Sequence, residues 1–290
     1  MPETTLGALA ALGAAMTWAV TGLLARSLVP ELGSVVVNAV RSAIGGAILL
    51  VWVLATAGAG AFTAASTHAL VLLALSIVAA IAIGDTVFFE STRMLGVGRA
   101  MTISMTYPVG AAALAAAFLG EPATLPVAAG TLLTLGGVVL IMAPWAERAP
   151  DERFWFGVGA ATLASLAWAV SVVLVKPPLR EMEAVTAQAI RLPLAAMVLW
   201  ATPWARSAGL GRIGGAALAR LAVLGVVTAL SSVMFVASVK YAGVAVAAVL
   251  SSTAPMFAIP LAWVCFGERL SRGALVGAGV TVAGIVVLQL

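Results

Sequence analysis

The chain has 290 residues, of which 63% are hydrophobic and 9% are charged, whereas an ordinary soluble domain has about 25% charged residues. This composition excludes a water-soluble fold. The net charge of +4 does not indicate a nucleic-acid-binding protein, because the basic residues are scattered over short loops, as expected of cations that flank a membrane. Cys265 and His68 are the single cysteine and histidine of the sequence. We therefore expect no intrachain disulfide, no His/Cys metal site and no cofactor.

The chain is built from apolar stretches long enough to cross a bilayer, which takes roughly 20 residues per helix. About ten such stretches use nearly the whole chain, with centres near residues 15, 45, 79, 108, 133, 165, 195, 229, 255 and 281. The sequence thus predicts an all-α integral membrane protein with ten transmembrane helices. We interpret the polar stretch 144–153 as a linker between residues 1–143 and 154–290.

The two halves repeat one another. Three motifs recur, the first two at an offset of 150 residues and the last at 147: Trp18-Ala19-Val20 as Trp168-Ala169-Val170, Asn38-Ala39-Val40-Arg41 as Gln188-Ala189-Ile190-Arg191, and Gly120-Glu121 as Gly267-Glu268. Because each half holds five predicted helices, an odd number, the second half enters the membrane from the opposite side. We predict two inverted repeats that enclose a central cavity and alternate its access, as in many transporters.

Charges within the predicted spans are the first candidates for a functional site, because a charge deep in a bilayer normally faces a cavity or a partner. Arg41 in the second helix and Asp85 in the third lie at similar depths of antiparallel helices, so an ion pair between them is allowed. The repeat carries Arg41 into Arg191 but Asp85 into Ser232. Two interpretations stay open: a structural fixture, or a latch or substrate site that exists on one side only.

Aromatic and polar residues complete the candidate cavity. Trp18 and Trp168 lie within spans, away from the interfaces where Trp is usually enriched, and Tyr107 lies at a similar depth. They predict an aromatic lining suited to an apolar side chain or an ammonium group. The remaining candidates are polar residues of the same spans: Thr17, Asn38, Gln188, Ser104 and Ser251.

Two repeat-equivalent prolines are candidate hinges. Pro108 in the fourth helix and Pro255 in the ninth each remove a hydrogen bond to the carbonyl four residues earlier. Those carbonyls belong to Ser104 and Ser251. We expect kinks there, either satisfied by neighbouring helices or open to the cavity.

Other features suggest structural roles. Glu90 and Arg93 can pair along one helix face, and Glu121 and Glu268 are expected to fix loop geometry. The fifth and tenth helices are almost without polar groups, and the Gly273 to Gly277 spacing permits close helix packing. We interpret these two helices as a scaffold or a dimer face, so a monomer and a homodimer both stay open.

Several motifs resemble those of the EamA domain of the drug/metabolite transporter superfamily. They are Lys240 to Ala245, Ser251 to Pro255 and Phe266 to Leu270 in the second half, and Arg93 to Val97, Tyr107-Pro108 and Leu119 to Pro122 in the first. The resemblance covers essentially the whole chain. It implies a ten-helix bundle that moves small metabolites, often exporting amino acids, and we expect such a protein in a prokaryotic inner membrane.

Two questions of orientation and coupling stay open. The positive-inside rule places both termini outside the cytoplasm, whereas the resemblance implies cytoplasmic termini. Asp85 and Glu90 are the acids within the predicted spans, and proton coupling through either is a second open question.

Three classes of function compete. The leading hypothesis is an exporter of amino acids or similar zwitterions, in which Arg41 and Arg191 meet a carboxylate and Asp85 or the aromatics meet an amine. A proton-coupled exporter of lipophilic cations is the alternative, with Asp85 supplying the carboxylate. A membrane enzyme is disfavoured, because the sequence has no clustered Asp, His or Cys with metal or nucleophile spacing.

Overall fold

The computed structural model describes residues 2–63, 65–95, 97–142, 152–206, 214–254, 256–257, 261 and 272–288. Every regular element in these ranges is a helix. The elements of the first half are α1 (Glu3–Leu32), α2 (Ser34–Thr56), α3 (Gly60–Thr63), α4 (Thr67–Ile77), the π-helix η1 (Val78–Asp85), α5 (Thr86–Leu95), α6 (Val97–Ser104), α7 (Tyr107–Leu119) and α8 (Leu125–Met142). Those of the second half are α9 (Glu152–Val175), the 3₁₀ helix η2 (Pro177–Arg180), α10 (Ala184–Trp200), α11 (Pro203–Arg206), α12 (Gly215–Ala242), α13 (Val244–Ser251) and α15 (Arg272–Leu288).

The repeat seen in the sequence is also a repeat of helix boundaries. α6 (Val97–Ser104) and α13 (Val244–Ser251) begin and end at equivalent positions, 147 residues apart. α8 and α15 begin at the same offset, and α10 begins 150 residues after α2. The continuous run of α4, η1 and α5 corresponds to the single long helix α12. Where both halves are described, they therefore share this series of helices.

Many of the helices are long and apolar enough to cross a membrane. Five reach full span length in the described ranges, namely Glu3–Leu32, Ser34–Thr56, Thr67–Leu95, Arg153–Arg180 and Gly215–Ala242. Four shorter apolar helices accompany them, Tyr107–Leu119, Leu125–Leu140, Ala184–Trp200 and Val276–Val287. Nine of the ten predicted centres fall within helices, and the centre near residue 255 lies outside the described residues. The all-helical membrane fold is confirmed, and the count of ten spans stays a prediction.

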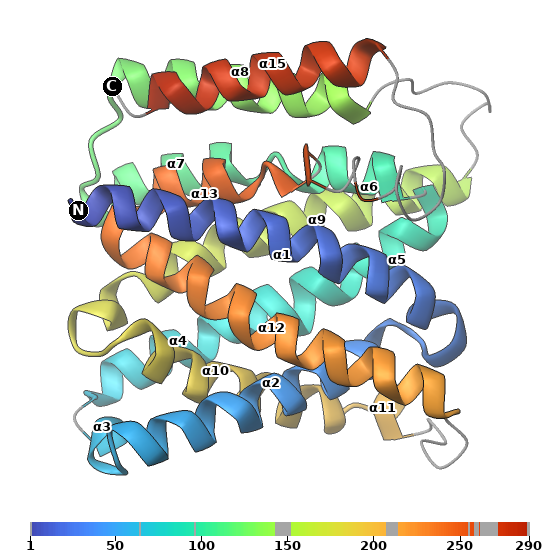
Figure 1. Cartoon of the computed structure of the whole chain (residues 1–290), viewed down its shortest axis with the longest axis vertical. Helices are drawn as coiled ribbons and strands as arrows, with labels where there is room; N and C mark the ends of the chain where they lie inside the picture. The colour runs from blue at the N-terminus through green and yellow to red at the C-terminus, as the bar shows by residue number, and fades with distance from the viewer. Residues whose placement is uncertain are drawn as a thin grey trace.

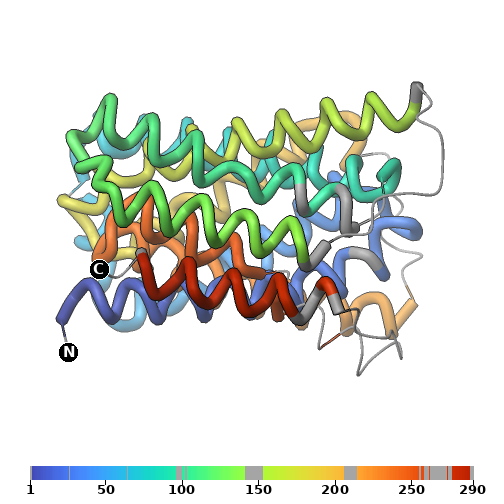
Figure 2. Tube along the Cα trace, turned by 90° about the horizontal axis from the view of Figure 1, so that it is seen from above, coloured from blue at the N-terminus to red at the C-terminus, as the bar shows by residue number. Residues whose placement is uncertain are grey.

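The two repeats interlock rather than lie side by side. The closest helix partners come from opposite halves: α1 packs with α12, α2 with α10, α8 with α15, and α9 with α4, η1 and α5. Figure 1 shows α1 and α9 running in opposite directions, as inverted repeats require. The start of α1 and the end of α15 lie at the same end of the molecule (Figures 1 and 2).

The pair α8 and α15 forms one edge of the molecule, and α2 with α10 forms the opposite edge (Figure 1). Glycines bring α8 and α15 together: a methyl group at Gly137 would lie 2.7 Å from the Gly277 carbonyl oxygen. The small-residue spacing of the last helix therefore serves packing between the two repeats. At the other edge, a methyl at Gly46 would lie 2.7 Å from the Cδ of Pro193, so this glycine lets α2 and α10 approach closely.

Two spans of the first half depart from a regular α-helix. The third contains the π-helical turns Val78–Asp85, an irregularity frequent at functional sites. The fourth is interrupted, because α6 ends at Ser104 and α7 begins at Tyr107. Pro108 occupies the first turn of α7, where its missing N–H leaves no intrahelical bond unmade. The span is thus interrupted just before Pro108, where the sequence analysis expected a kink, and the role of Pro108 as a hinge stays a prediction. The equivalent Pro255 lies outside the described residues.

Candidate functional site

A central cavity of about 140 Å³ lies where the two repeats meet. Eight of the predicted site residues line it: Trp18, Arg41, Asp85, Tyr107, Trp168, Gln188, Arg191 and Ser232. They come from seven different elements, the helices α1, α2, α7, α9, α10 and α12 together with η1. Because both repeats contribute walls, relative movement of the repeats changes the shape of this cavity.

The acid and the base predicted to pair do so. One Arg41 guanidinium nitrogen donates to Asp85 Oδ2, and the exposed fractions of the two side chains are 7% and 20%. The other carboxylate oxygen, Asp85 Oδ1, accepts a hydrogen bond from the Trp168 indole Nε1 at 2.9 Å. Asp85 therefore ties α2 of the first repeat to α9 of the second.

The shape of η1 depends on side chains from the helices around it. The Asn38 amide donates to the Ile81 carbonyl oxygen at 2.8 Å, and Trp168 Nε1 also approaches the Ala80 carbonyl oxygen at 3.2 Å. A methyl group at Gly84 would lie 2.6 Å from Trp168 Nε1. Because Gly84 has no side chain, the Trp168 indole can approach the backbone of η1 and the Asp85 carboxylate.

Arg41 is held in place by further contacts. Its Nε donates to Asn38 Oδ1 at 2.8 Å, and its guanidinium carbon lies 5.6 Å from the centroid of the Phe89 ring. The Thr228 hydroxyl of α12 lies 3.5 Å from its NH1. This shell keeps the guanidinium beside Asp85.

Arg191, the repeat equivalent of Arg41, is also buried, with 3% of its surface exposed. Its hydrogen bonds go to neutral oxygens: Nε donates to Ser76 Oγ at 3.0 Å, NH1 to Gln188 Oε1 at 2.9 Å and NH2 to Ser171 Oγ at 3.2 Å. No carboxylate pairs with it in the described part of the chain. Its positive charge is therefore balanced less well than that of Arg41.

The aromatic wall is richer than the sequence analysis predicted. Trp168 packs on Phe88 with ring centroids 5.3 Å apart, and Trp18 packs on Phe235 at 5.1 Å. Tyr107 meets Trp168 edge-on at 6.0 Å. Phe88 and Phe235 were missed, although they are equivalent at the 147-residue offset and follow Asp85 and Ser232 by three positions. The 147-residue offset of the repeat could have identified both residues from the sequence.

The charged groups that line the cavity are two arginines and one aspartate in the described residues. With both guanidinium groups charged and the Asp85 carboxylate paired with Arg41, the lining has a net charge of +1. In a low-dielectric interior an uncompensated cation is costly. A ligand that brings one negative charge would relieve that cost.

Four predicted cavity residues lie in helix packing instead. Thr17 donates to the carbonyl oxygens of Gly13 and Ala14 of its own helix, both at 2.9 Å. Asn38 supports η1 and Arg41, as described above. Neither side chain lines the cavity.

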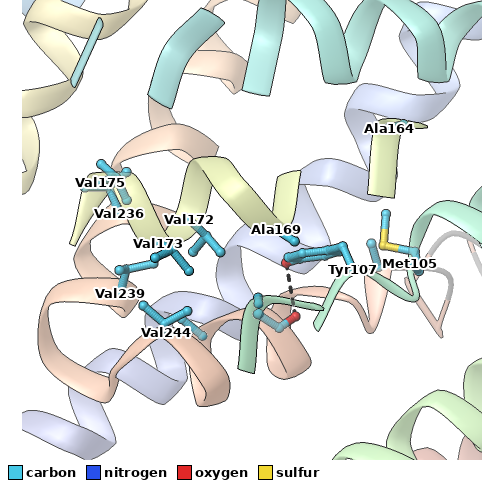
Figure 3. Packing of buried hydrophobic residues seen from close by; sticks show 14 of the residues in the cluster. Met105, Tyr107, Ala164, Ala169, Val172, Val173, Val175, Val236, Val239 and Val244 are labelled. Atoms are coloured by element: carbon cyan, nitrogen blue, oxygen red, sulfur yellow. Dashed lines mark hydrogen bonds between the residues drawn. The ribbon is translucent and has the colours of Figure 1, made fainter. Parts of the chain in front are cut away.

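Ser104 and Ser251 likewise join helices. Ser104 Oγ donates to the Ala161 carbonyl oxygen of α9 at 3.1 Å, and Ser251 Oγ lies 2.6 Å from the Tyr107 hydroxyl. Tyr107 also donates to the Ala248 carbonyl oxygen at 3.1 Å. Figure 3 shows Tyr107 within the buried cluster, between Ala169 and Met105. These hydroxyls stabilise the positions of the interrupted helices beside the cavity.

Two carboxylates outside the cavity have structural contacts. Glu121 Oε1 accepts from the backbone N–H of Val244 at 2.9 Å and so caps the N-terminus of α13, as a carboxylate at a helix N-terminus is expected to do. Glu90 and Arg93 form the predicted pair at 2.6 Å. Glu268 lies outside the described residues.

The Glu181 carboxylate accepts hydrogen bonds from the backbone N–H and the hydroxyl of Ser66, at 2.8 and 2.9 Å. It links η2 to the start of α4, outside the spans. Hydrogen bonds to the charged form, first from the Ser66 N–H and then from its hydroxyl, lower the pKa of Glu181 below its usual value. Within the described ranges no group of three or more His, Cys, Asp or Glu residues is placed to hold a metal ion.

Comparisons with known proteins identify the family of the chain. No curated protein matches the chain. A solved structure titled "Crystal structure of protein" has the same fold, with a TM-score of 0.81 over 97% of this chain and 94% of that chain at 19% sequence identity. The EamA-like transporter family matches twice, over residues 5–143 and 155–290. Those two matches are the two repeats, and the chain therefore belongs to the EamA-like transporter family.

Proposed function

We propose that this protein exports amino acids or similar zwitterions from a prokaryotic cell, across the inner membrane. The family supports transport of a small molecule rather than an enzymatic reaction. The observation that carries the choice of substrate is the lining of the cavity, where the described residues include two buried arginines and one aspartate among aromatic rings.

Charge balance favours a carboxylate-bearing substrate. A carboxylate would neutralise the surplus positive charge near Arg191, while an ammonium group has a place near Asp85 or over the face of an aromatic ring. A lipophilic cation, the alternative class, would raise the charge of the lining and its bound ligand from +1 to +2. Such a cation would bind only if an anion or a proton shift accompanied it.

The size of the cavity favours a small metabolite. Its volume of about 140 Å³ is on the order of ten times the minimum that one water needs. A substrate with about the number of heavy atoms of an aliphatic amino acid matches that volume better than a nucleotide sugar does. The aromatic rings around Trp18 and Trp168 suit an apolar side chain.

Alternating access is the mechanism that we propose for this movement. The two repeats are related by inversion, so the same motion performed by either repeat opens the cavity to opposite sides. Asp85 holds Arg41 of α2 and Trp168 of α9 at once. Release of one of these contacts would let α2 and α9 separate, and this cluster is therefore the proposed latch.

Counterflow in proteoliposomes tests the substrate class. Vesicles preloaded with one compound are challenged with labelled amino acids, quaternary ammonium ions or sugar phosphates. We expect exchange of amino acids by the native chain, reduction of that exchange on Arg191→Gln, and unchanged exchange on Glu90→Gln, which removes a charge outside the cavity. Exchange of quaternary ammonium ions without amino acids would overturn the proposal.

Proton coupling is tested in the same vesicles. A pH gradient is imposed without a substrate gradient, and uptake is compared for the native chain, Asp85→Asn and Glu90→Gln. If a proton travels on Asp85, the pH-driven part of the uptake disappears in Asp85→Asn alone. Equal pH dependence in all three proteins would mean that neither acid carries the proton.

A further inference from the structure

Two donors, one from each repeat, converge on the Asp85 carboxylate and form the first of two related arrangements. Arg41 forms the ion pair with one oxygen, and the Trp168 indole N–H donates to the other at 2.9 Å. At the offsets of the repeat, the equivalent positions in the second arrangement are Arg191, Trp18 and Ser232. The second arrangement therefore keeps both donors and lacks the acceptor.

The two arrangements match in geometry as well as in sequence. The tilted ring pairs Trp168 with Phe88 and Trp18 with Phe235 have centroid distances of 5.3 and 5.1 Å and interplanar angles of 54° and 44°. Each arginine also donates to the side-chain oxygen of the residue three positions before it, at 2.8 Å in the first repeat and 2.9 Å in the second. The ring pair and the supported arginine beside position 85 are thus both repeated beside position 232.

Ser232 does not replace the missing acceptor. Its hydroxyl donates to the Ala229 carbonyl oxygen of its own helix at 3.0 Å. Its backbone carbonyl accepts from the Gln188 amide at 2.9 Å, and Gln188 in turn accepts from Arg191. Gln188 therefore links Arg191 to Ser232 by hydrogen bonds, and this chain of contacts contains no negative charge.

Two donors on one face of α1 are placed to bind an acceptor in the cavity. The Trp18 indole N–H has no hydrogen-bond acceptor within the described residues, whereas its counterpart Trp168 has two. Thr21, one turn later on α1, is 8% exposed, and its buried hydroxyl has no partner. Both residues line the cavity together with Arg191 and Ser232.

We infer that the carboxylate of the substrate takes, in the second arrangement, the position that the Asp85 side chain takes in the first. It pairs with Arg191 and accepts the indole N–H of Trp18, beside Ser232. This inference rests on the proposed function and makes it specific, because it assigns one end of the substrate to one set of residues. The rest of the substrate then extends along the rings of Trp18 and Phe235.

Substituting Ser232→Asp tests the inference directly, because the new side chain supplies the missing carboxylate. Ser232→Asn is the matched control, since it adds nearly the same volume without the charge. Binding of three probes to the purified full-length chain is measured by the shift of its unfolding temperature. The probes are L-leucine, 4-methylpentanoate, which lacks the amine, and L-leucinamide, which lacks the carboxylate.

We expect the native chain to bind leucine and 4-methylpentanoate, and to bind leucinamide more weakly. Ser232→Asp should weaken both by about tenfold or more, the size expected for loss of a charge-assisted contact, and should spare leucinamide. Ser232→Asn, which adds the volume without the charge, should weaken both probes clearly less than Ser232→Asp does. Trp18→Phe removes the indole N–H and keeps the ring, and it should weaken the two carboxylates but not the amide.

The outcomes separate this inference from the proposed function. Equal binding of leucine by Ser232→Asp and the native chain would overturn the inference and leave the proposed function standing. Equal losses in Ser232→Asp and Ser232→Asn would also overturn it, because crowding would then explain both. Binding of 4-methylpentanoate without leucine, lost in Ser232→Asp, would overturn the zwitterion hypothesis and support the carboxylate site.

Discussion

Asp85→Asn is the substitution that best tests the proposed latch. It removes the negative charge that faces Arg41 but keeps a side-chain oxygen that can accept the Trp168 indole N–H. Arg41 and Asp85 have exposed side-chain fractions of 7% and 20%, so the pair is shielded from water without being sealed from it. A hydrogen bond to a charged group contributes about 1.5–3 kcal/mol net. Partial exposure of Asp85 favours the lower end, about 1.5 kcal/mol.

That free energy sets the expected shift in populations. If the pair forms in only one of the two access states, losing about 1.5 kcal/mol changes their ratio roughly tenfold. The shift goes toward the state in which α2 and α9 are apart. Asp85→Glu keeps the charge and should shift the ratio less than Asp85→Asn does.

Distances between spin labels measure this ratio in detergent or in nanodiscs. Cys265, the chain's single cysteine, is first replaced by Ser. One label pair occupies the exposed positions Trp155 and Pro203 at one end of the bundle, and a second pair occupies Thr56 and Ala123 at the other end. Identical distance distributions for Asp85→Asn and the parent chain would refute the latch. So would an equal shift in Ser232→Asn, which changes the equivalent position without breaking an ion pair.

Three further predictions follow from contacts outside the latch. Tyr107→Phe removes the hydrogen bonds to Ala248 and Ser251 and should lower the free energy of unfolding by about 1–2 kcal/mol, measured as a lower unfolding temperature; no change would mean that the hydroxyl is dispensable. Glu121→Gln should cost about 1 kcal/mol by weakening the cap of α13, seen as faster amide exchange at Val244, and an unaltered rate there would contradict the cap. The contact of Glu181 with Ser66 should stabilise the native state above the ordinary glutamate pKa of 4.5 and lose this effect as the pH falls through the lowered pKa. Exchange protection of the Ser66 amide should follow that curve, and Glu181→Gln should abolish its pH dependence.

The ion pair and its one-sidedness could be predicted from sequence for a simple physical reason. Arg41 and Asp85 are charges inside apolar spans of antiparallel helices, so depth alone nearly determines which groups can meet. The repeat then showed that Ser232 takes the place of Asp85. Phe88 and Phe235 could have been found in the same way, because they obey the same offset.

The irregular backbone could not be predicted in this way. The segment Val78–Asp85 is apolar up to its last residue, and nothing in its pattern indicates a π-helix. Its wide turns leave carbonyl oxygens that accept from other helices, namely from the Asn38 amide and the Trp168 indole. Contacts between residues far apart in the chain decide such a shape, and local propensity does not.

Small hydroxyl side chains were the other source of error. Thr17 bonds to carbonyls of its own helix, whereas Ser104 reaches a neighbouring helix. A short hydroxyl in a membrane helix has both choices, and the sequence does not tell them apart. The large and charged residues were placed in the cavity more reliably, because few other positions in a bilayer accept them.

The pairing of α8 with α15, and of every long helix with one from the other half, has a consequence for biogenesis. When the first half leaves the ribosome and enters the bilayer, most of the surfaces that it will bury still face lipid. The glycine face of α8 in particular stays exposed to lipid until α15, which begins 147 residues later in the chain, is inserted. The first half therefore cannot bury these faces by itself, and the two repeats can close on one another only after α15 has entered the bilayer.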